Sequence, residues 1–209
     1  MNGQQALVLF PSGRIPLERA LVLRLTCFGV TMILCVDLDG TLIKTDTTWL
    51  AVEQFLRKNP LHCWRLLVWL LHGRAYLKQQ LGQAVQLDPS TLPYHKELIQ
   101  WLIERQQNGD TLVLATATDQ IFAQSVAKYL GIFTQVIASD GRHNLRAKYK
   151  AAALTSQFGL KGYSYVGNSW DDLAVWRESR TAIVVNASKR LERRVRKIAD
   201  VVRVFDGKF

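Results

Sequence analysis

The chain has 209 residues, of which 48% are hydrophobic, so it can bury one sizeable core and still carry a small inserted module. Its three cysteines, Cys27, Cys35 and Cys63, are widely spaced and form no C-x-x-C pair, which argues against a disulfide framework or a zinc site and favours a reducing compartment. The formal net charge of +10 favours an anionic partner, which could be a phosphorylated substrate, an acidic membrane surface or nucleic acid. No nucleic-acid-binding module is recognisable around the basic stretch 189–197, so no specific nucleic acid is expected.

Residues 1–31 form an extension that fits poorly with the rest of the chain. Pro11 and Pro16 break regular structure, and the segment 17–30 is neither a clean signal peptide nor long enough to span a bilayer. Two interpretations remain open: an amphipathic segment lying on a membrane or on the domain, or an extension without structural importance. Because Met32 stands one residue before the first strand, a further hypothesis is that translation begins there.

An apolar, β-prone run over residues 32–36 ends at two carboxylates, Asp37 and Asp39. The run predicts a buried strand, and at its C-terminal edge residues i and i+2 can both reach a bound ligand. Two acids on an apolar strand are costly unless a cation compensates them, and Mg²⁺, which prefers oxygen ligands, suits this pair. Gly40 then permits a sharp exit and a close backbone approach. The alternative is an Asp-Gly turn that closes a hairpin and leaves both acids in solvent.

Residues 43–109 contain no convincing strand. Apolar residues recur at helical spacing over Thr48–Lys58, Leu61–Gln80 and Tyr94–Gln107. We therefore predict a helical cap inserted after the first strand. Such an insert stands over the strand ends like a lid, where it excludes water and selects the substrate.

The segment Leu61–His72 is apolar almost all round and carries two tryptophans. At about a dozen residues it cannot span a membrane. The favoured interpretation is the central helix of a small cap bundle, and the alternative is an interfacial helix that lies in lipid headgroups. His62 and His72 have no partners at metal-ligand spacing, so capping or solvated roles are expected.

Strands and helices alternate through the rest of the chain. Further strands are predicted at Thr111–Ala115, Gln135–Ala138, Tyr163–Val166, Thr181–Val185 and Val201–Phe205. Helices are predicted at Gln120–Leu130, Ala151–Gly159 and Ser188–Ile198. This alternation indicates an α/β fold with a Rossmann-like parallel sheet that has helices on both faces. The core is expected to span residues 32–42 and 110–209, and the helical cap residues 43–109.

The sequence VDLDGTL at residues 36–42 resembles the first motif of the haloacid dehalogenase (HAD) superfamily of hydrolases. The resemblance implies that Asp37 is the nucleophile and Asp39 the general acid/base. It extends to Thr116, at the place of the hydroxyl that binds the phosphoryl group. It extends also to Lys150, at the place of the lysine that neutralises phosphate charge, with Lys148 and then Arg146 as alternatives for that role. The implied substrate-binding residues are Gly40, Thr41, Thr116 and Ala117.

The stretch Gly167–Asp172 resembles the fourth motif of the same superfamily, G-D-x-x-x-D, in which the acids serve a magnesium site. The implied cofactor is Mg²⁺, and the implied metal residues are Asp37, Asp39, Asn168 and Asp172, with Asp171 as a substitute ligand nearby. Here Asn168 replaces the first acid of the motif. An amide oxygen can still coordinate Mg²⁺ but brings no charge, so metal affinity should fall and activity could be lost.

The resemblance is closer still to one phosphoserine phosphatase-like branch. The sequences LATATD, ASDGRHNLRAKYKAAAL and YVGNSWDDLAVW look like the HAD domain that is associated with UbiA-type membrane prenyltransferases. This resemblance implies a phosphatase acting on a small phosphorylated substrate, such as a prenyl- or sugar-linked phosphate. It further implies a cytoplasmic location, with peripheral contact to the inner face of a membrane or to a membrane prenyltransferase.

Three functions are compatible with these observations. The leading hypothesis is Mg²⁺-dependent hydrolysis of phosphomonoesters through an aspartyl-phosphate intermediate. The second, motivated by Asn168, is a weakened or inactive domain that serves as a regulatory or docking partner of a membrane prenyltransferase. The third, a nucleic-acid-binding protein that exploits the +10 charge, ranks below both because charge alone would produce such binding.

Overall fold

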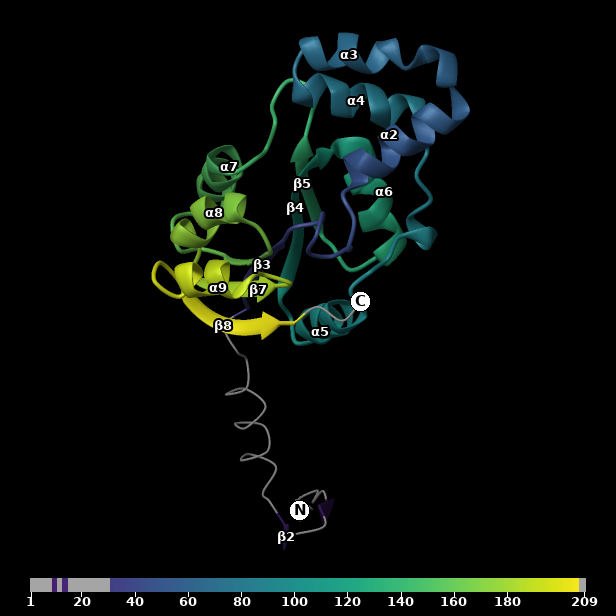
Figure 1. The fold of residues 1–209 in the computed structure, drawn as a ribbon. Helices are drawn as coiled ribbons and strands as arrows, with labels where there is room; N and C mark the ends of the chain where they lie inside the picture. The colour runs from purple at the N-terminus through teal and green to yellow at the C-terminus, as the bar shows by residue number, and fades with distance from the viewer. Residues whose placement is uncertain (1–8, 11–12, 15–30, 207–209) are drawn as a thin grey trace. The chain divides into compact units, whose positions relative to one another are not determined.

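The computed structural model describes residues 9–10, 13–14 and 31–206 (Figure 1). The chain divides into two compact units, residues 1–31 and 32–209. In the first unit, β1 (Leu9–Phe10) pairs antiparallel with β2 (Gly13–Arg14). The expected amphipathic segment 17–30 lies wholly outside the described residues, and the hypothesis that translation begins at Met32 stays untested.

Six parallel strands form the sheet of the second unit. Their bounds are β3 (Ile33–Val36), β4 (Thr111–Asp119), β5 (Gln135–Ser139), β6 (Ser164–Gly167), β7 (Thr181–Val185) and β8 (Asp200–Phe205). They lie in the order β5-β4-β3-β6-β7-β8, and every pair is parallel. The first strand of the sheet is therefore central, and the chain leaves it first toward β4 and later returns on its other side at β6. Ligands of such sheets bind at this point, beyond the carboxyl ends of the strands.

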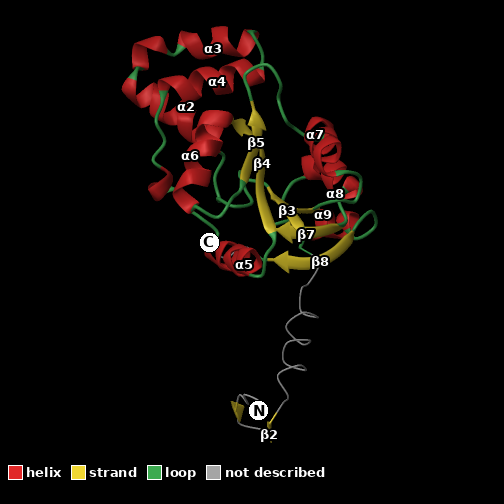
Figure 2. Cartoon of the chain, turned by 180° about the vertical axis from the view of Figure 1, so that it is seen from behind, coloured by secondary structure: helices red, strands yellow, loops and turns green. Residues whose placement is uncertain are grey.

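The alternation of side chains along each strand builds two cores. On β3, Leu34 and Val36 pack into one core, whereas Cys35 packs into the other. The first core includes residues of α5 (Lys96–Gln107) and α6 (Gln120–Leu130). The second includes residues of α7 (Lys148–Phe158), α8 (Leu173–Glu178) and α9 (Lys189–Val195). Figure 2 shows these two groups of helices on opposite faces of the sheet, which confirms the predicted fold class.

The cap consists of three helices that share a hydrophobic cluster with the core. They are α2 (Thr47–Lys58), α3 (Trp64–Leu71) and α4 (Arg74–Ala84). Phe55 of α2, Trp69 of α3 and Leu81 of α4 pack together with Phe122 of α6. The cap therefore rests on the N-terminal part of α6, beside the carboxyl end of β4. Short 3-10 helices complete the described part of the chain at η1 (Pro60–His62), η2 (Pro89–Thr91) and η3 (Trp170–Asp172).

Two expectations for the cap differ from the structure. The run Leu61–Gln80 is not one helix, because Gly73 adopts a φ of +107° and separates α3 from α4. The segment Leu61–His72 contributes a helix to the cap, as expected, but α3 is not central in it, since Trp69 is the one buried residue of α3. Periodicity shows that a segment is apolar, but it does not show which of its faces a neighbour covers.

Three boundaries also differ from those expected. Residues 43–109 were expected to form the cap, but Leu98 and Leu102 of α5 pack into the core of the sheet. Strand β4 continues to Asp119, four residues beyond its predicted end. Helix α9 ends at Val195, earlier than expected. No helix in the described ranges has both the length and the apolar character needed to cross a bilayer.

Candidate active site

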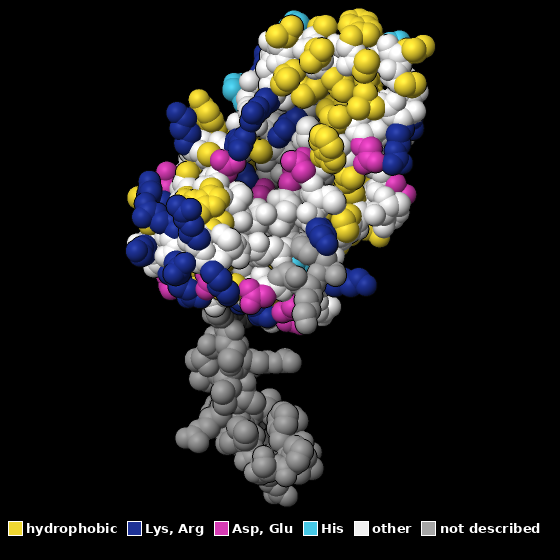
Figure 3. All heavy atoms as spheres, viewed as in Figure 1, with side chains coloured by type: hydrophobic (Ala, Val, Ile, Leu, Met, Phe, Trp, Pro, Cys, Tyr) yellow, Lys and Arg dark blue, Asp and Glu magenta, His cyan; other side chains and the backbone are white. Residues whose placement is uncertain are grey.

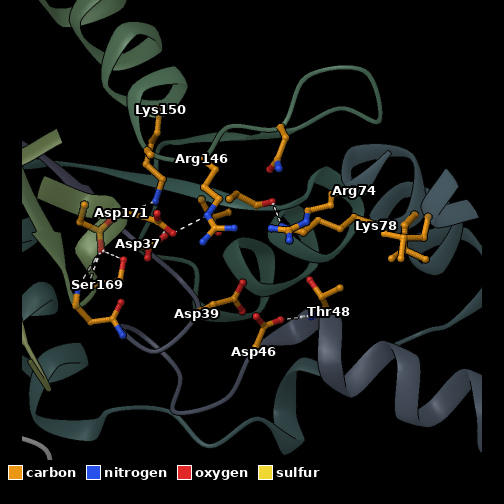
Figure 4. A pocket seen from close by; sticks show the side chains of 18 residues that line it. Asp37, Asp39, Asp46, Thr48, Arg74, Lys78, Arg146, Lys150, Ser169 and Asp171 are labelled. Atoms are coloured by element: carbon orange, nitrogen blue, oxygen red, sulfur yellow. Dashed lines mark hydrogen bonds and ion pairs between the residues drawn. The ribbon is translucent and has the colours of Figure 1, made fainter. Parts of the chain in front are cut away.

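A cavity of about 430 Å³ lies beyond the carboxyl ends of β3, β4 and β6, under the cap (Figure 4). Asp37 and Asp39 enter it from the end of β3, Thr116 and Ala117 from β4, and Asn168 from the residues after β6. Parallel strands bring their carboxyl ends to one edge, so residues far apart in sequence meet there. The remaining lining residues come from the cap and its start, from the segment around the start of α7, and from the residues that follow β6: Asp46, Thr48, Leu70, Arg74, Leu77, Lys78, Asn144, Arg146, Ala147, Lys150, Ser169, Asp171 and Asp172.

Asp37 is held at the edge of the sheet by its backbone and by Lys150. Its backbone N–H donates to the carbonyl oxygen of Val166 over 3.0 Å, which extends the pairing of β3 with β6 by one residue. Lys150, in the first turn of α7, donates from Nζ to Oδ1 of Asp37 over 2.8 Å. Both side chains are buried, so this ion pair is shielded from water. Lys150 therefore occupies the position of a cation that neutralises negative charge beside Asp37.

Asp172 lies behind Lys150 and joins a buried network. Lys150 Nζ donates to the hydroxyl of Tyr165 over 2.8 Å, and that hydroxyl donates to Oδ1 of Asp172 over 2.8 Å. Oδ2 of Asp172 accepts hydrogen bonds from the backbone N–H groups of Asn168 and Ser169 and from the Ser169 hydroxyl. Because both oxygens of Asp172 already accept hydrogen bonds, this geometry favours a positioning role over direct metal ligation. Tyr165 sits inside a buried strand, where its pattern resembles that of any core residue, so the sequence did not reveal it.

Burial and neighbouring charges have opposing effects on the pKa of Asp37. The pKa of the Asp37 carboxyl is raised to about 7, because burial and the nearby Asp172 carboxylate raise it by more than the Lys150 ammonium lowers it. Lys150 itself loses hydration on burial, which lowers its pKa, but Asp37 and Asp172 raise that pKa by more. A buried cation with two carboxylate neighbours keeps its proton, so Lys150 carries its charge across the physiological range.

Asp39 is held by the start of the cap. Its Oδ1 accepts a hydrogen bond from the backbone N–H of Thr47 over 2.8 Å, and its Oδ2 accepts from the hydroxyls of Thr47 and Thr118. Burial raises the pKa of Asp39, and Asp46 raises it further, whereas the hydrogen bonds from Thr118 and Thr47 lower it. A carboxyl group with a raised pKa, open to a cavity, can exchange a proton with a ligand there. Thr118 reaches Asp39 over 79 residues of sequence and Thr47 over eight, and no sequence pattern marked either contact.

Asn168 packs directly over Gly40. Gly40 has a φ of +74°, and a Cβ atom built on it would lie 2.2 Å from Nδ2 of Asn168. The sharp turn after Asp39 therefore requires glycine for its conformation and for the space that Asn168 fills. Asn168 was selected in the sequence as a candidate metal residue, and the structure brings it to the same cavity as Asp37.

The residues expected to bind substrate divide into two pairs. Thr116 and Ala117 line the cavity, and the Thr116 hydroxyl accepts the backbone N–H of Thr118 over 3.0 Å. Gly40 and Thr41 do not line it, and Thr41 is completely buried. The geometry therefore does not support a side-chain contact between Thr41 and a substrate in this cavity.

Three further cationic side chains line the cavity: Lys78 and Arg74, which were not selected from the sequence, and Arg146, which was selected as an alternative to Lys150. Lys78 of α4 donates to the carbonyl oxygen of Ala117 over 2.7 Å, and burial lowers its pKa although Asp39 opposes that shift. Arg74, also of α4, is exposed and makes no hydrogen bond or ion pair with the described residues. Arg146, an alternative to Lys150, instead pairs with Asp171 over 2.6 Å. The cap cations were missed because only the folded structure brings α4 over the sheet edge.

The donor atoms at the cavity suit a hard cation. They include the carboxylate of Asp37 and the amide oxygen of Asn168, and oxygen ligands of this kind are those that Mg²⁺ prefers. The described residues contain no group of three His, Cys, Asp or Glu side chains that could hold a metal ion. A divalent ion here would thus depend on Asp37, the Asn168 amide, the backbone carbonyl of Asp39 and water, with a single charged side chain among its ligands.

Sequence comparison finds a relative over most of the chain but no family. No family model matches the chain. An uncharacterized protein, y4nM, of Sinorhizobium fredii is 31% identical over 182 residues, which cover 87% of this chain. The chain spans only 35% of the length of that relative.

Solved structures of phosphatases and hydrolases share the architecture. A phosphoserine phosphatase, seen with an analogue of its phospho-aspartyl intermediate, aligns with a TM-score of 0.56 and 12% identity over 86% of this chain and 95% of its own. A HAD family hydrolase of Salmonella enterica serovar Typhi aligns with a TM-score of 0.58 and 12% identity over 91% of this chain and 75% of its own. At these identities the likeness concerns the fold, and the chain has a HAD-like α/β fold.

Proposed function

We propose that the chain belongs to the HAD superfamily and hydrolyses phosphomonoesters through an aspartyl-phosphate intermediate. The observation that carries this proposal is the buried contact of 2.8 Å between Lys150 Nζ and Oδ1 of Asp37, in a cavity that Asp39 shares. A carboxylate, a fixed cation and a second carboxyl group of raised pKa are the parts that this chemistry needs. The shared fold with a phosphoserine phosphatase that forms a phospho-aspartyl species supports the same reaction.

In the first half of the reaction, an oxygen of Asp37 attacks phosphorus and the bond from phosphorus to the leaving oxygen breaks. Asp39, protonated, donates its proton to that oxygen, and the alcohol leaves. Lys150 lies against Asp37, where its charge offsets the negative charge of the incoming phosphoryl group. Lys78 and Arg74 face the cavity from the cap and are placed to bind the rest of an anionic substrate.

In the second half, Asp39, now a carboxylate, removes a proton from a water molecule. That water attacks phosphorus, the bond from phosphorus to Asp37 breaks, and inorganic phosphate is released. The hydrogen bonds from Thr47 and Thr118 keep the Asp39 carboxyl in one place through both proton transfers. A Mg²⁺ ion held by Asp37, the carbonyl of Asp39 and Asn168 would supply additional charge neutralisation at the phosphoryl oxygens.

Hydrolysis of p-nitrophenyl phosphate in the presence of Mg²⁺ tests this function. Asp37→Asn should lower kcat by about 10³-fold or more, because the amide cannot act as the nucleophile. Asp200→Asn, an exposed change at the start of β8, is the matched control and should leave the rate unchanged. Equal rates for the Asp37 variant and the unaltered chain would rule out the mechanism.

A second candidate function rests on Asn168. Its neutral amide stands where a charged ligand would bind Mg²⁺ more tightly, which is compatible with a weakened domain that regulates or docks to a membrane prenyltransferase. Asn168→Asp separates the two functions. A large gain in Mg²⁺ affinity and turnover would favour the weakened domain, whereas a loss of turnover would favour an active site adapted to the amide.

We further infer that the substrate is a prenyl- or sugar-linked phosphate. Leu70 and Leu77 line the cavity beside its cations, so the cavity offers apolar contact as well as charge. A panel of short prenyl phosphates, sugar phosphates and phosphoserine would distinguish these classes by kcat/KM. Preference for phosphoserine over both other classes would contradict this substrate assignment without affecting the proposed reaction.

A further inference from the structure

Helix α3 presents an apolar face that no described residue covers. The face consists of Trp64, Leu67, Val68 and Leu71 of α3 together with Leu61 of the preceding η1, all of them exposed. At 100° per residue these side chains share one side of the helix, and Trp69, which is buried against Phe55, lies on the opposite side. In Figure 3, hydrophobic side chains gather over the part of the molecule where Figure 1 places the cap. Soluble surfaces rarely gather so many large apolar side chains without a partner.

The sequence that contains α3 carries charged side chains of a single sign. The chain has no Asp or Glu between Glu53 and Asp88, although that stretch contains five Lys and Arg residues. Lys58 is exposed at the end of α2, Arg65 is exposed on α3 itself, and Arg74 begins the next helix. The Arg65 guanidinium lies 5.0 Å from the centre of the Trp69 ring, which holds it along the flank of α3.

An apolar face with basic residues beside it fits some partner surfaces better than others. Two copies of the chain packed face to face through α3 would bring Lys58, Arg65 and Arg74 close to the same residues of the partner, with no carboxylate in the stretch to pair with them. An anionic lipid surface instead offers hydrocarbon for the apolar face and phosphate for its flanks. An eight-residue helix cannot cross a bilayer, but it can lie along its surface.

We propose that α3 docks the cap onto an anionic membrane surface, with the α3 apolar face in the acyl boundary and its basic flanks on the headgroups. Leu70 adjoins this face and also lines the active-site cavity. Docking through α3 would thus bring the cavity close to the lipid surface. Binding to lipid does not require turnover, so it can fail or succeed independently of the proposed phosphatase reaction.

Co-sedimentation of the full chain with vesicles tests the docking. Vesicles of phosphatidylglycerol and phosphatidylcholine should bind the protein, and vesicles of phosphatidylcholine alone should bind it at least about tenfold more weakly. The double variant Leu67→Glu/Leu71→Glu should lower the partition coefficient on the anionic vesicles by about tenfold or more, because it replaces the centre of the apolar face with charge. Both of these side chains are exposed, so circular dichroism should show an unaltered fold.

Two control variants distinguish α3 from the rest of the basic surface. Leu160→Glu changes an equally exposed leucine outside the cap, and Arg190→Gln/Arg194→Gln removes two charges from the basic helix α9. Both should leave the partition coefficient within about twofold. Anionic-vesicle binding that survives the α3 variant, or that is lost with the α9 variant instead, would overturn the proposal. A dimer in sedimentation velocity that the α3 variant abolishes, without vesicle binding by the unaltered chain, would assign the face to a second copy and overturn it too.

Discussion

The sheet edge and the cap line one cavity, but the cation of the sheet edge is paired with carboxylates whereas the cations of the cap are not. At the sheet edge Lys150 is buried and contacts both Asp37 and Tyr165. On the cap, the Lys78 ammonium donates a hydrogen bond to a neutral carbonyl group, and neither Lys78 nor Arg74 forms an ion pair with the described residues. The groups assigned to bond breaking are thus positioned before a substrate arrives, whereas the cap keeps cations available for one. This difference predicts that changes at the sheet edge affect kcat and stability together, and that changes on the cap affect KM.

The largest effect is expected at Lys150. Lys150→Met leaves the Asp37 and Asp172 carboxyls buried without their cation, so it should lower the free energy of unfolding by about 3–5 kcal/mol. The kcat for p-nitrophenyl phosphate should fall by about 10³-fold. Chemical denaturation and steady-state kinetics measure the two effects. A variant with lowered kcat and full stability would show that the buried network is not what fixes Lys150.

Gly40→Ala tests the contact between the turn and Asn168. The positive φ alone should cost about 1–2 kcal/mol of stability. Gly131→Ala is the matched control, since Gly131 also has a positive φ but has no atom within 4 Å of the added Cβ. Gly40→Ala should lose at least as much stability as Gly131→Ala, and only Gly40→Ala should displace Asn168 and weaken the dependence on Mg²⁺. Equal metal dependence in the two variants would show that Asn168 does not take part in metal binding.

Arg74→Ala should raise KM for an anionic substrate by about tenfold, because one charge-assisted contact is lost. The kcat and the free energy of unfolding should change little, since Arg74 has no partner in the described protein to leave unpaired. Arg65→Ala, on α3 and away from the cavity, is the control and should not alter KM. If Arg74→Ala lowered kcat as much as Lys150→Met, the proposed division between kcat effects at the sheet edge and KM effects on the cap would be wrong.

Thr118→Val should give the smallest effect, a shift in the pH profile. The Thr118 hydroxyl donates to the Asp39 carboxylate and lowers its pKa, so its removal should raise that pKa further. The protonated form of Asp39 donates to the leaving oxygen, and therefore the alkaline limb of the kcat profile for an alkyl phosphate should move to higher pH. Thr48→Val, in the same cavity but without a contact to Asp39, should leave the limb in place. A shift to lower pH would contradict the acid role of Asp39.

The sequence predicted much of the sheet edge because its signals are local. Apolar runs ended by polar residues predicted Asp37, Thr116 and Asn168 at one edge of the sheet, and all three line the cavity there although β4 continues past Thr116 to Asp119. Lys150 opens a helix after β5 and reaches Asp37 over 113 residues of sequence, so its position was predicted from resemblance and not from spacing.

The cap resisted prediction because its features depend on packing. Composition could not show that α3 would lie at the surface of the cap with one face uncovered, since an apolar helix can be buried on any side. The hydrogen bonds that hold Asp39 come from two threonines in different elements, Thr47 and Thr118, and threonine has many roles at the ends of helices and strands. The cations of α4 reach the cavity only after three helices fold over α6.

Asp37 is the residue that should receive the phosphoryl group, and this transfer can be measured directly. Reduction with borohydride during turnover of p-nitrophenyl phosphate converts an aspartyl-phosphate to homoserine, and peptide mapping then identifies the residue. The Asp39→Asn variant is the best material, because it should form the intermediate with this good leaving group but hydrolyse it slowly. We predict homoserine at position 37. Turnover with residue 37 recovered only as aspartate, and the reduced residue found elsewhere or nowhere, would contradict the proposed mechanism.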